Sequence, residues 1–205
     1  MMSKKSTPAI VKPEGLEKVL LHACCAPCST AIVEWLKNNS LKPTIFYYNP
    51  NIFPKEEYDK RRDESRRHAE MNGIDWIEGE WDHEVWKKAV EGHEHDAERQ
   101  GRCQICFNLR MKKAAEKAKE LGIDTFTTTL ASSRWKNLDQ VNAAGAKAEA
   151  ETDGTSFWAQ NWRKGGLQER RNALIKEGNF YNQLYCGCEY SMRIKDDDID
   201  KNLPK

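Results

Sequence analysis

Short apolar runs and longer amphipathic segments alternate along the chain. Residues 18–22 form an apolar run, and residues 29–36 then carry apolar side chains at helical spacing, which predicts a strand, a loop and a helix. The same alternation continues to about residue 178, with turn residues or glycine between the segments. Strands are expected at residues 18–22, 44–48, 76–77, 125–129 and 157–158, and helices at residues 29–36, 55–72, 82–91, 108–121, 139–151 and 166–178.

Strands that alternate with helices of this length predict an α/β fold, a mostly parallel sheet with crossover helices of the Rossmann-like or HUP-like kind. Ligands in such sheets bind beyond the carboxyl ends of the strands. Residues 24–28 and 131–136 each follow a strand, so these loops are expected at that edge. Residues 1–194 are expected to form a single domain. Residues 195–205 are charged and lack periodicity, which predicts a disordered tail.

The charge balance limits the possible partners. The chain has 205 residues, with 33 Lys and Arg against 32 Asp and Glu. This excludes a globally basic nucleic-acid coat, so any RNA contact must come from a local patch. The run over residues 60–67 mixes arginines with acidic residues and is expected to be a solvated helix face. We expect a cytoplasmic protein without membrane contact, because neither a membrane span nor a secretory signal is readable.

Seven cysteines stand in three short motifs. Cys24, Cys25 and Cys28 form the first, Cys103 and Cys106 the second, and Cys186 and Cys188 the third. An odd, clustered set without a secretory signal argues against a structural disulfide framework, while inert buried thiols are the plain alternative. The spacing is compatible with an iron–sulfur cluster, a zinc site or a thiol–disulfide relay. Mixed short spacings favour iron–sulfur, and its four ligands would leave three thiols for a second function.

Five motifs follow one another along most of the chain. They cover residues 21–29, 48–52, 103–110, 126–130 and 185–188, which read LHACCAPCS, YNPNI, CQICFNLR, FTTTL and YCGC. Together they resemble the QueH family of epoxyqueuosine reductases. The resemblance implies an oxidoreductase of queuosine biosynthesis and tRNA processing. Such an enzyme removes the epoxide oxygen of epoxyqueuosine at the wobble position of tRNA, giving queuosine, and needs no cobalamin.

The resemblance also implies a [4Fe-4S] cluster, which places iron–sulfur above zinc. In one assignment, Cys24, Cys25, Cys103 and Cys106 hold the cluster, Cys186 and Cys188 form a redox-active disulfide pair, and Cys28 is a further catalytic thiol. In the other, Cys24, Cys103, Cys106 and Cys188 hold the cluster, and Cys25, Cys28 and Cys186 hold an additional mononuclear iron. The sequence leaves both assignments open.

The implied partners are tRNA carrying epoxyqueuosine in the anticodon loop and an external electron donor, with no DNA. Unpaired RNA bases stack on aromatic side chains, and phosphates pair with Lys and Arg. Two segments, residues 134–136 and 162–164, interleave both kinds of side chain. The expected RNA contacts are Arg134, Lys136, Arg163 and Lys164. The alternative for both segments is surface charge beside core tryptophans.

Two other functions would use parts of the same sequence pattern. A zinc-stabilised RNA-binding module without catalysis would also use a C-x-x-C motif and basic-aromatic segments. An adenylating enzyme of related α/β type would need a phosphate-binding loop after the first strand, where residues 24–28 read CCAPC instead. Epoxide removal consumes two electrons and two protons, and proton donors are expected among His22, Tyr48, Tyr185 and Tyr190.

Overall fold

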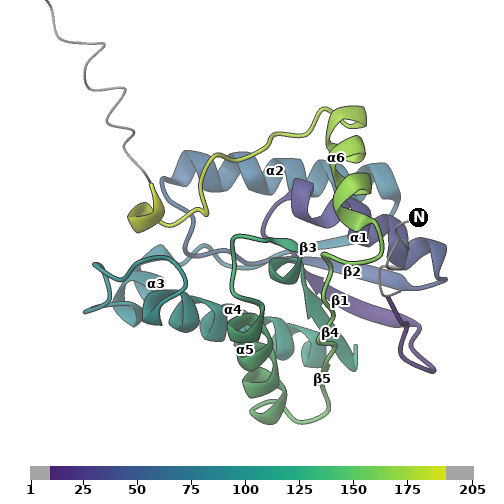
Figure 1. Ribbon diagram of the computed structural model, residues 1–205. Coiled ribbons are helices and arrows are strands. Elements are labelled where there is room, and N and C mark those ends of the chain that lie inside the picture. Colours follow the sequence, from purple (N-terminus) through teal and green to yellow (C-terminus); the bar gives the residue numbers. More distant parts are fainter. Residues whose placement is uncertain (1–9, 193–205) are drawn as a thin grey trace, which may run out of the picture.

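A five-stranded sheet forms the centre of the protein (Figure 1). The computed structural model describes residues 10–192. The strands lie in the order β3-β2-β1-β4-β5, and all neighbouring pairs are parallel. They are β1 (Lys18–His22), β2 (Lys42–Tyr47), β3 (Asp75–Glu78), β4 (Thr125–Thr128) and β5 (Ser156–Phe157). The predicted α/β fold with a parallel sheet is confirmed, and the predicted tail over residues 195–205 lies outside the described residues.

Helices cover both faces of this sheet. In Figure 1, α1, α2 and α6 lie on one side of the strands and α4 and α5 on the other. The helices are α1 (Ala26–Asn38), α2 (Lys55–Asn72), α3 (His83–Ala89), α4 (Gly101–Glu120), α5 (Leu138–Ala150) and α6 (Leu167–Glu177), with short 3-10 turns η1 (Thr129–Ser132) and η2 (Glu189–Ser191). Within residues 10–192, no helix is long and apolar enough to cross a membrane.

Local sequence explains where several elements begin and end. Gly73 ends α2 in the left-handed conformation, with φ of +61°, which glycine adopts without strain. Asn137 starts α5 because its side chain accepts hydrogen bonds from the first backbone N–H groups of the helix. β1 is buried after Lys18, as a central parallel strand with helices over both faces requires. Such local signals account for the agreement between predicted and observed elements.

α4 begins at Gly101, earlier than the apolar spacing predicted. Its first turns therefore contain Cys103 and Cys106, which their three-residue spacing places on one face of the helix. The early start depends on the preceding loop, because the Arg102 backbone N–H donates a hydrogen bond to the Asp96 carboxylate at 2.7 Å. The Arg102 guanidinium also donates to three backbone carbonyls of that loop. Apolar periodicity could not reveal this start, since the contacts that stabilise it are polar.

Candidate metal centre

The cysteine motif after β1 lies where the sheet topology reverses, with β2 on one side of β1 and β4 on the other. At such a point the carboxyl ends of the strands leave a crevice for ligands. The Cys24 backbone N–H donates to the Thr129 hydroxyl at 3.1 Å. The Ala23 N–H donates to the Phe46 carbonyl, and the Asn49 amide donates to the Ala23 carbonyl, both at 2.9 Å. Groups from three strand ends thus hold the motif at the predicted edge.

Three buried thiols meet in this motif. The Sγ atoms of Cys24, Cys25 and Cys28 all lie within 4.8 Å of one another, and those of Cys24 and Cys25 are 3.7 Å apart. Cys25 is the N-cap residue of α1, and Cys28 lies in the first turn of that helix, so the change of chain direction brings the side chains together. Clustered soft thiolates are typical ligands of iron–sulfur clusters, iron or zinc. This donor set fits a metal centre.

Hydrogen bonds within this trio give its thiols different acidities. Hydrogen bonds from Cys25 and Cys28 lower the pKa of Cys24 well below its usual value. Burial raises the pKa of Cys25 well above its usual value, and the hydrogen bond with Cys24 raises the pKa of Cys28 to about 11. The thiol of Cys24 is therefore the most acidic of the three. Metal binding at all three sulfurs would release the remaining protons.

α2 holds the third cysteine motif in place through Arg61. The Arg61 guanidinium donates to the Cys186 carbonyl at 3.1 Å, to the Tyr185 carbonyl at 3.3 Å and to the Glu57 carboxylate at 2.7 Å. Its side chain is 1% exposed. Next to this motif, the Gln183 amide donates to Cys25 Sγ at 3.1 Å. The first and third cysteine motifs are thereby connected through the C-terminal segment.

The expectation that residues 60–67 form a solvated helix face was wrong for Arg61. Tyr58, Arg61, Ser65 and Ala69 recur at helical spacing and form part of the buried side of α2. Glu57, four residues before Arg61, was a sequence signal for an ion pair. The carbonyl groups of Tyr185 and Cys186 lie 124 and 125 residues after Arg61 in the chain, so no local sequence pattern predicts these hydrogen bonds.

Gly187 separates the two cysteines of the third motif and has φ of +131°, a conformation that L side chains rarely adopt. A Cβ atom there would lie 3.0 Å from Arg61 Nη1 and 3.1 Å from Ile52 Cγ1. We expect Gly187→Ala to lower the free energy of unfolding by about 1–3 kcal/mol and to reduce the bound metal. Gly154→Ala is the control, because Gly154 has φ of +83° with open space around it. Urea unfolding and metal analysis measure both effects, and equal metal content in the two variants would contradict the expectation.

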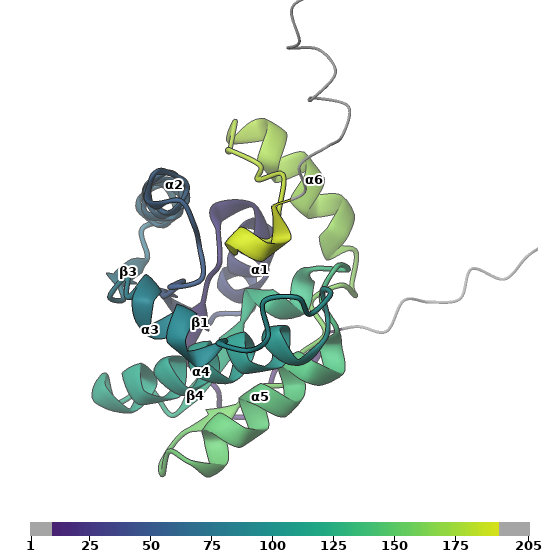
Figure 2. The ribbon, with the colours of Figure 1, turned by 90° about the vertical axis from the view of Figure 1, so that its left-hand side faces the viewer.

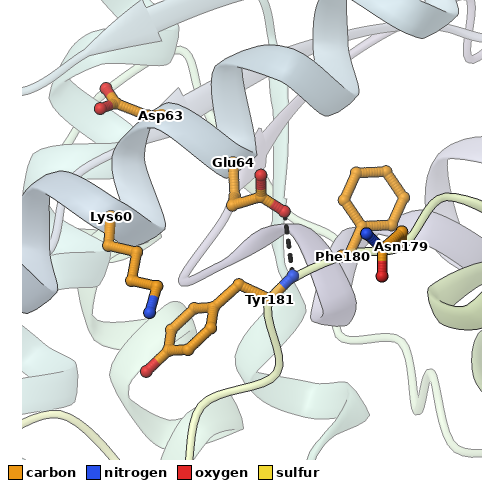
Figure 3. Close-up of a pocket in the computed structure, with 6 residues that line it drawn as sticks. All are labelled: Lys60, Asp63, Glu64, Asn179, Phe180 and Tyr181. Carbon is orange, nitrogen blue, oxygen red and sulfur yellow. Dashed lines mark hydrogen bonds between the residues drawn. The ribbon is translucent and has the colours of Figure 1, made fainter.

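The chain just before the third motif is fastened to the surface of α2 (Figure 3). The Tyr181 N–H donates to the Glu64 carboxylate at 3.0 Å, and the Lys60 ammonium lies 3.8 Å from the centroid of the Tyr181 ring. The Tyr181 hydroxyl donates to Glu57 at 2.9 Å. The hollow here is also lined by Asp63, Asn179 and Phe180 and contains no cysteine. It belongs to the attachment of the C-terminal segment.

Cys103, Cys106, Cys186 and Cys188 form a second group of thiols. Cys106 and Cys188 pack into one apolar cluster with Trp86. Burial raises the pKa of Cys103 and Cys106, and it raises that of Cys188 to about 11. An electrostatic effect of Cys186 contributes to each of these pKa shifts, so the four side chains lie near one another. All seven cysteines are free thiols, and the disulfide pair stays a prediction.

Four cationic side chains lie among the cysteines: Arg61, Arg102, Arg110 and Lys136. The three arginines are at most 2% exposed, and buried guanidinium groups need negative partners. Although burial opposes its charge, the negative charges of Cys186, Cys24 and Cys28 raise the pKa of Lys136. The Arg110 guanidinium in addition donates to the side-chain oxygen of Asn49 at 2.5 Å. Cations in these positions fit an anionic thiolate centre better than a set of inert neutral thiols.

Two of the four expected proton donors make structural hydrogen bonds. His22 is buried, with Nδ1 lying 2.8 Å from the Thr128 hydroxyl and Nε2 lying 3.0 Å from the Tyr48 carbonyl. Burial lowers the pKa of His22 to about 3, so the ring is neutral and joins the strand ends. The Tyr185 hydroxyl donates to the Phe53 carbonyl. Neither group has a proton free for a substrate in this arrangement.

The four expected RNA contacts divide into two kinds. Arg134 and Lys164 are exposed. Lys136 is partly buried and faces the charges of the cysteines. Arg163 donates to the Lys136 carbonyl at 2.8 Å, which joins the two basic-aromatic segments. Trp162 lies in the core with no exposed surface, as the alternative for that segment predicted. The RNA contacts themselves stay a prediction.

Comparisons with known proteins agree with the motif order. The sequence model described as "Epoxyqueuosine reductase QueH" matches residues 19–194. The epoxyqueuosine reductase QueH of Histophilus somni is 43% identical, covering 91% of this chain and 76% of that protein. The QueH of Haemophilus influenzae is 42% identical, covering 88% of this chain and 74% of that protein. The QueH of Thermotoga maritima is 34% identical, covering 85% and 90%.

The fold of this chain also resembles that of a solved structure. It is a predicted subunit of a tRNA methyltransferase from Methanocaldococcus jannaschii, with a TM-score of 0.52 and 12% identity, covering 79% of this chain and 76% of that chain. This likeness concerns the fold alone. The match of the family model to residues 19–194 and the relatives above 30% identity, by contrast, concern nearly the whole chain. The chain therefore belongs to the epoxyqueuosine reductase QueH family.

Proposed function

We propose that this chain removes the epoxide oxygen of epoxyqueuosine at the wobble position of tRNA, giving queuosine, at a metal centre held by its cysteines. Membership of the QueH family makes it an epoxyqueuosine reductase, an oxidoreductase that needs no cobalamin. The observation that carries the choice of site is the buried trio of thiols within 4.8 Å at the carboxyl end of β1. The surrounding cations support a centre that carries negative charge.

The reaction converts an epoxide, two electrons and two protons into an alkene and water. A bound iron–sulfur centre would supply electrons one at a time, and a second iron would polarise the epoxide oxygen. The protein contributes the trio of buried thiols at the carboxyl end of β1. It also contributes Lys136, whose positive charge lies close to three of the thiols. The electrons must come from an external donor, which we place in the class of one-electron carriers.

We propose that Cys24, Cys103, Cys106 and Cys188 hold a [4Fe-4S] cluster and that Cys25, Cys28 and Cys186 hold an additional mononuclear iron. Packing of Cys188 against Cys106 supports their assignment to one centre. Lys136 is influenced by Cys24, Cys28 and Cys186, so Cys186 lies near the trio after β1, as its assignment to the second centre requires. In the competing assignment Cys25 replaces Cys188, and Cys186 and Cys188 form a redox pair.

The activity itself is tested on tRNA that carries epoxyqueuosine. The protein with its metal centre, a chemical reductant and this tRNA should yield queuosine, detected after nuclease digestion as loss of one oxygen by mass spectrometry. Protein stripped of metal and alkylated at its thiols should yield none, and full turnover by that sample would refute the mechanism. Stoichiometric zinc in a colourless, inactive protein would instead support the zinc-stabilised RNA-binding module.

Lys136 and Lys164 are expected to act differently although both were predicted as RNA contacts. Lys136→Met removes a cation beside the thiolates, so we expect the kcat at saturating tRNA to fall by about 10- to 100-fold. Lys164 is exposed, so Lys164→Ala should weaken tRNA binding. The slope of the logarithm of the binding constant against the logarithm of the salt concentration should fall by the contribution of about one phosphate contact. Binding and turnover at several salt concentrations separate the two effects. A Lys136→Met variant with normal kcat would contradict the role given to Lys136.

A further inference from the structure

Trp135 is unusual among the seven tryptophans because its side chain is 67% exposed. Trp86 and Trp162, by comparison, are buried in the core. Trp135 lies between η1 and α5, in the segment that follows β4 at the carboxyl end of the sheet. Burying a large aromatic side chain is among the strongest contributions to folding, and this side chain contributes little of it. Because Trp135 adds little to folding and lies near the cysteine centre, we expect its role to be in ligand binding.

The backbone around Trp135 is held by hydrogen bonds although the residue is 67% exposed. Arg99 donates from Nε to the Trp135 carbonyl at 2.9 Å and from Nη2 to the Arg134 carbonyl at 3.3 Å. Arg163 donates to the next carbonyl, that of Lys136, at 2.8 Å. Three successive carbonyls are thus fixed by guanidinium groups. A rigid aromatic side chain loses little conformational entropy when a ligand stacks on it.

Arg99 also connects this segment to the cysteine centre. Its backbone N–H donates to Cys103 Sγ at 3.3 Å, while its side chain holds the Trp135 segment. Arg99 has φ of +70°, a left-handed conformation that costs a non-glycine residue about 1 kcal/mol or more. Glycine would remove that strain but could not hold the two carbonyls. The strained residue therefore sets the position of Trp135 relative to Cys103.

The surroundings of Trp135 suit a nucleotide. Its neighbour Lys136 lies close enough to Cys24, Cys28 and Cys186 for their charges to act on it, so Trp135 is one residue away from the thiols of the centre. Arg134 lies over the indole at 5.4 Å from the ring centroid and, with Arg99, supplies exposed positive charge for phosphates. A protein partner would match an apolar patch with few charges better than a single indole among arginines.

We propose that Trp135 is the stacking platform for the unpaired base next to the wobble nucleotide, held at a fixed place beside the cysteine centre by Arg99 and Arg163. The inference rests on the proposed function, since it assumes that the wobble nucleotide is bound at the end of β1, beside the trio of thiols. The anticodon loop presents unpaired bases on both sides of that nucleotide. Any of the four bases can stack on an indole, so this contact positions the loop without reading its sequence.

The test uses the full chain with its metal centre and an RNA hairpin of the anticodon stem and loop. One hairpin carries the fluorescent base 2-aminopurine on the 5′ side of the wobble position, and another carries it on the 3′ side. Stacking on Trp135 should quench one of these probes when the protein binds. Trp135→Ala should abolish this quenching and raise the Kd of the hairpin by about 5- to 150-fold, as expected for one stacked base.

Three variants separate stacking from general effects. Trp135→Phe should keep part of the quenching and affinity, whereas Trp135→Leu, which is apolar but lacks a stacking face, should behave like Trp135→Ala. Arg99→Gly keeps the left-handed backbone but releases the segment, so it should weaken both signals. Leu121→Ala, at the other end of α4 from the cysteines, removes an exposed apolar side chain and should match the unchanged protein.

Two results would overturn the inference. One is a Trp135→Ala protein that binds the hairpin and quenches the probe like the unchanged protein. The other is a Trp135→Ala protein that binds RNA normally but loses turnover only when a protein donor, and not a chemical reductant, supplies the electrons, which would assign Trp135 to donor docking. Conversion of epoxyqueuosine by the unchanged protein, measured in the same preparation, tests the proposed function separately.

Discussion

Arg61→Ala is expected to lower the free energy of unfolding by about 3–5 kcal/mol, the cost of breaking a buried charge network, and to release bound metal. Arg61 is 1% exposed and joins Glu57 to the carbonyls of Tyr185 and Cys186. Its removal leaves a carboxylate of low exposure without its cation and two carbonyls without donors. The segment that carries Cys186 and Cys188 should then lose its attachment to α2.

Arg62→Ala is the matched control, one residue further along the same helix. Arg62 pairs with Asp59 and Asp63 near the surface, and such pairs contribute only about 0–1 kcal/mol. Arg61→Lys should rescue little, because a single ammonium cannot replace a guanidinium that reaches three acceptors in different directions. Urea unfolding followed by circular dichroism, with iron analysis of each variant, gives both readouts. A similar loss of metal in Arg61→Ala and Arg62→Ala would argue against the attachment.

Cys188→Ser is expected to lose the iron–sulfur cluster, while Cys28→Ser keeps it. The reason is the proposed division of ligands, in which Cys188 packs with Cys106 and Cys28 lies with Cys25 in the trio after β1. Serine keeps nearly the same volume but is a poor ligand for iron that prefers soft thiolate. We expect Cys188→Ser to lose the brown charge-transfer absorbance and its inorganic sulfide, and to have no activity.

Cys28→Ser should keep the absorbance and the sulfide but lose about one iron per chain, if three thiols hold a mononuclear iron and four hold the cluster. Its turnover should still fall sharply. Iron, sulfide and absorbance measured on the two proteins decide between the assignments. If Cys188→Ser retains the full cluster but is inactive, Cys188 is not a ligand and the redox pair with Cys186 becomes the better interpretation.

The sequence predicted the elements well where their causes are local. The helix over residues 55–72 ends at a glycine, and its bounds agree with α2. The prediction failed at the start of α4, where a carboxylate from the preceding loop stabilises the first turn. It also failed at Arg61, whose charge suggested solvent although its position on α2 is buried. In both places, the deciding contact is polar and lies outside the apolar periodicity.

The same division holds for the site. The short spacing of Cys24, Cys25 and Cys28 indicated metal or redox chemistry in the loop after the first strand, and the structure brings the three Sγ atoms within 4.8 Å of one another. The pairing of Cys106 with Cys188 joins residues far apart in sequence. Arg110 ends the motif that begins at Cys103, and Arg102 precedes it, but the burial of both arginines depends on how α4 packs in the folded protein.

The sequence by itself determined the order of strands and helices, the thiol chemistry and the family, because apolar periodicity and motif spacing are properties of short segments. Only the tertiary structure decided which thiols face one another, which cations offset their charge and where Trp135 lies relative to them. These contacts join α2, the start of α4 and the C-terminal segment, and Figure 2 shows the end of this segment, η2, on the side of the molecule that also carries α3. Their formation depends on packing between distant segments, which no local pattern records.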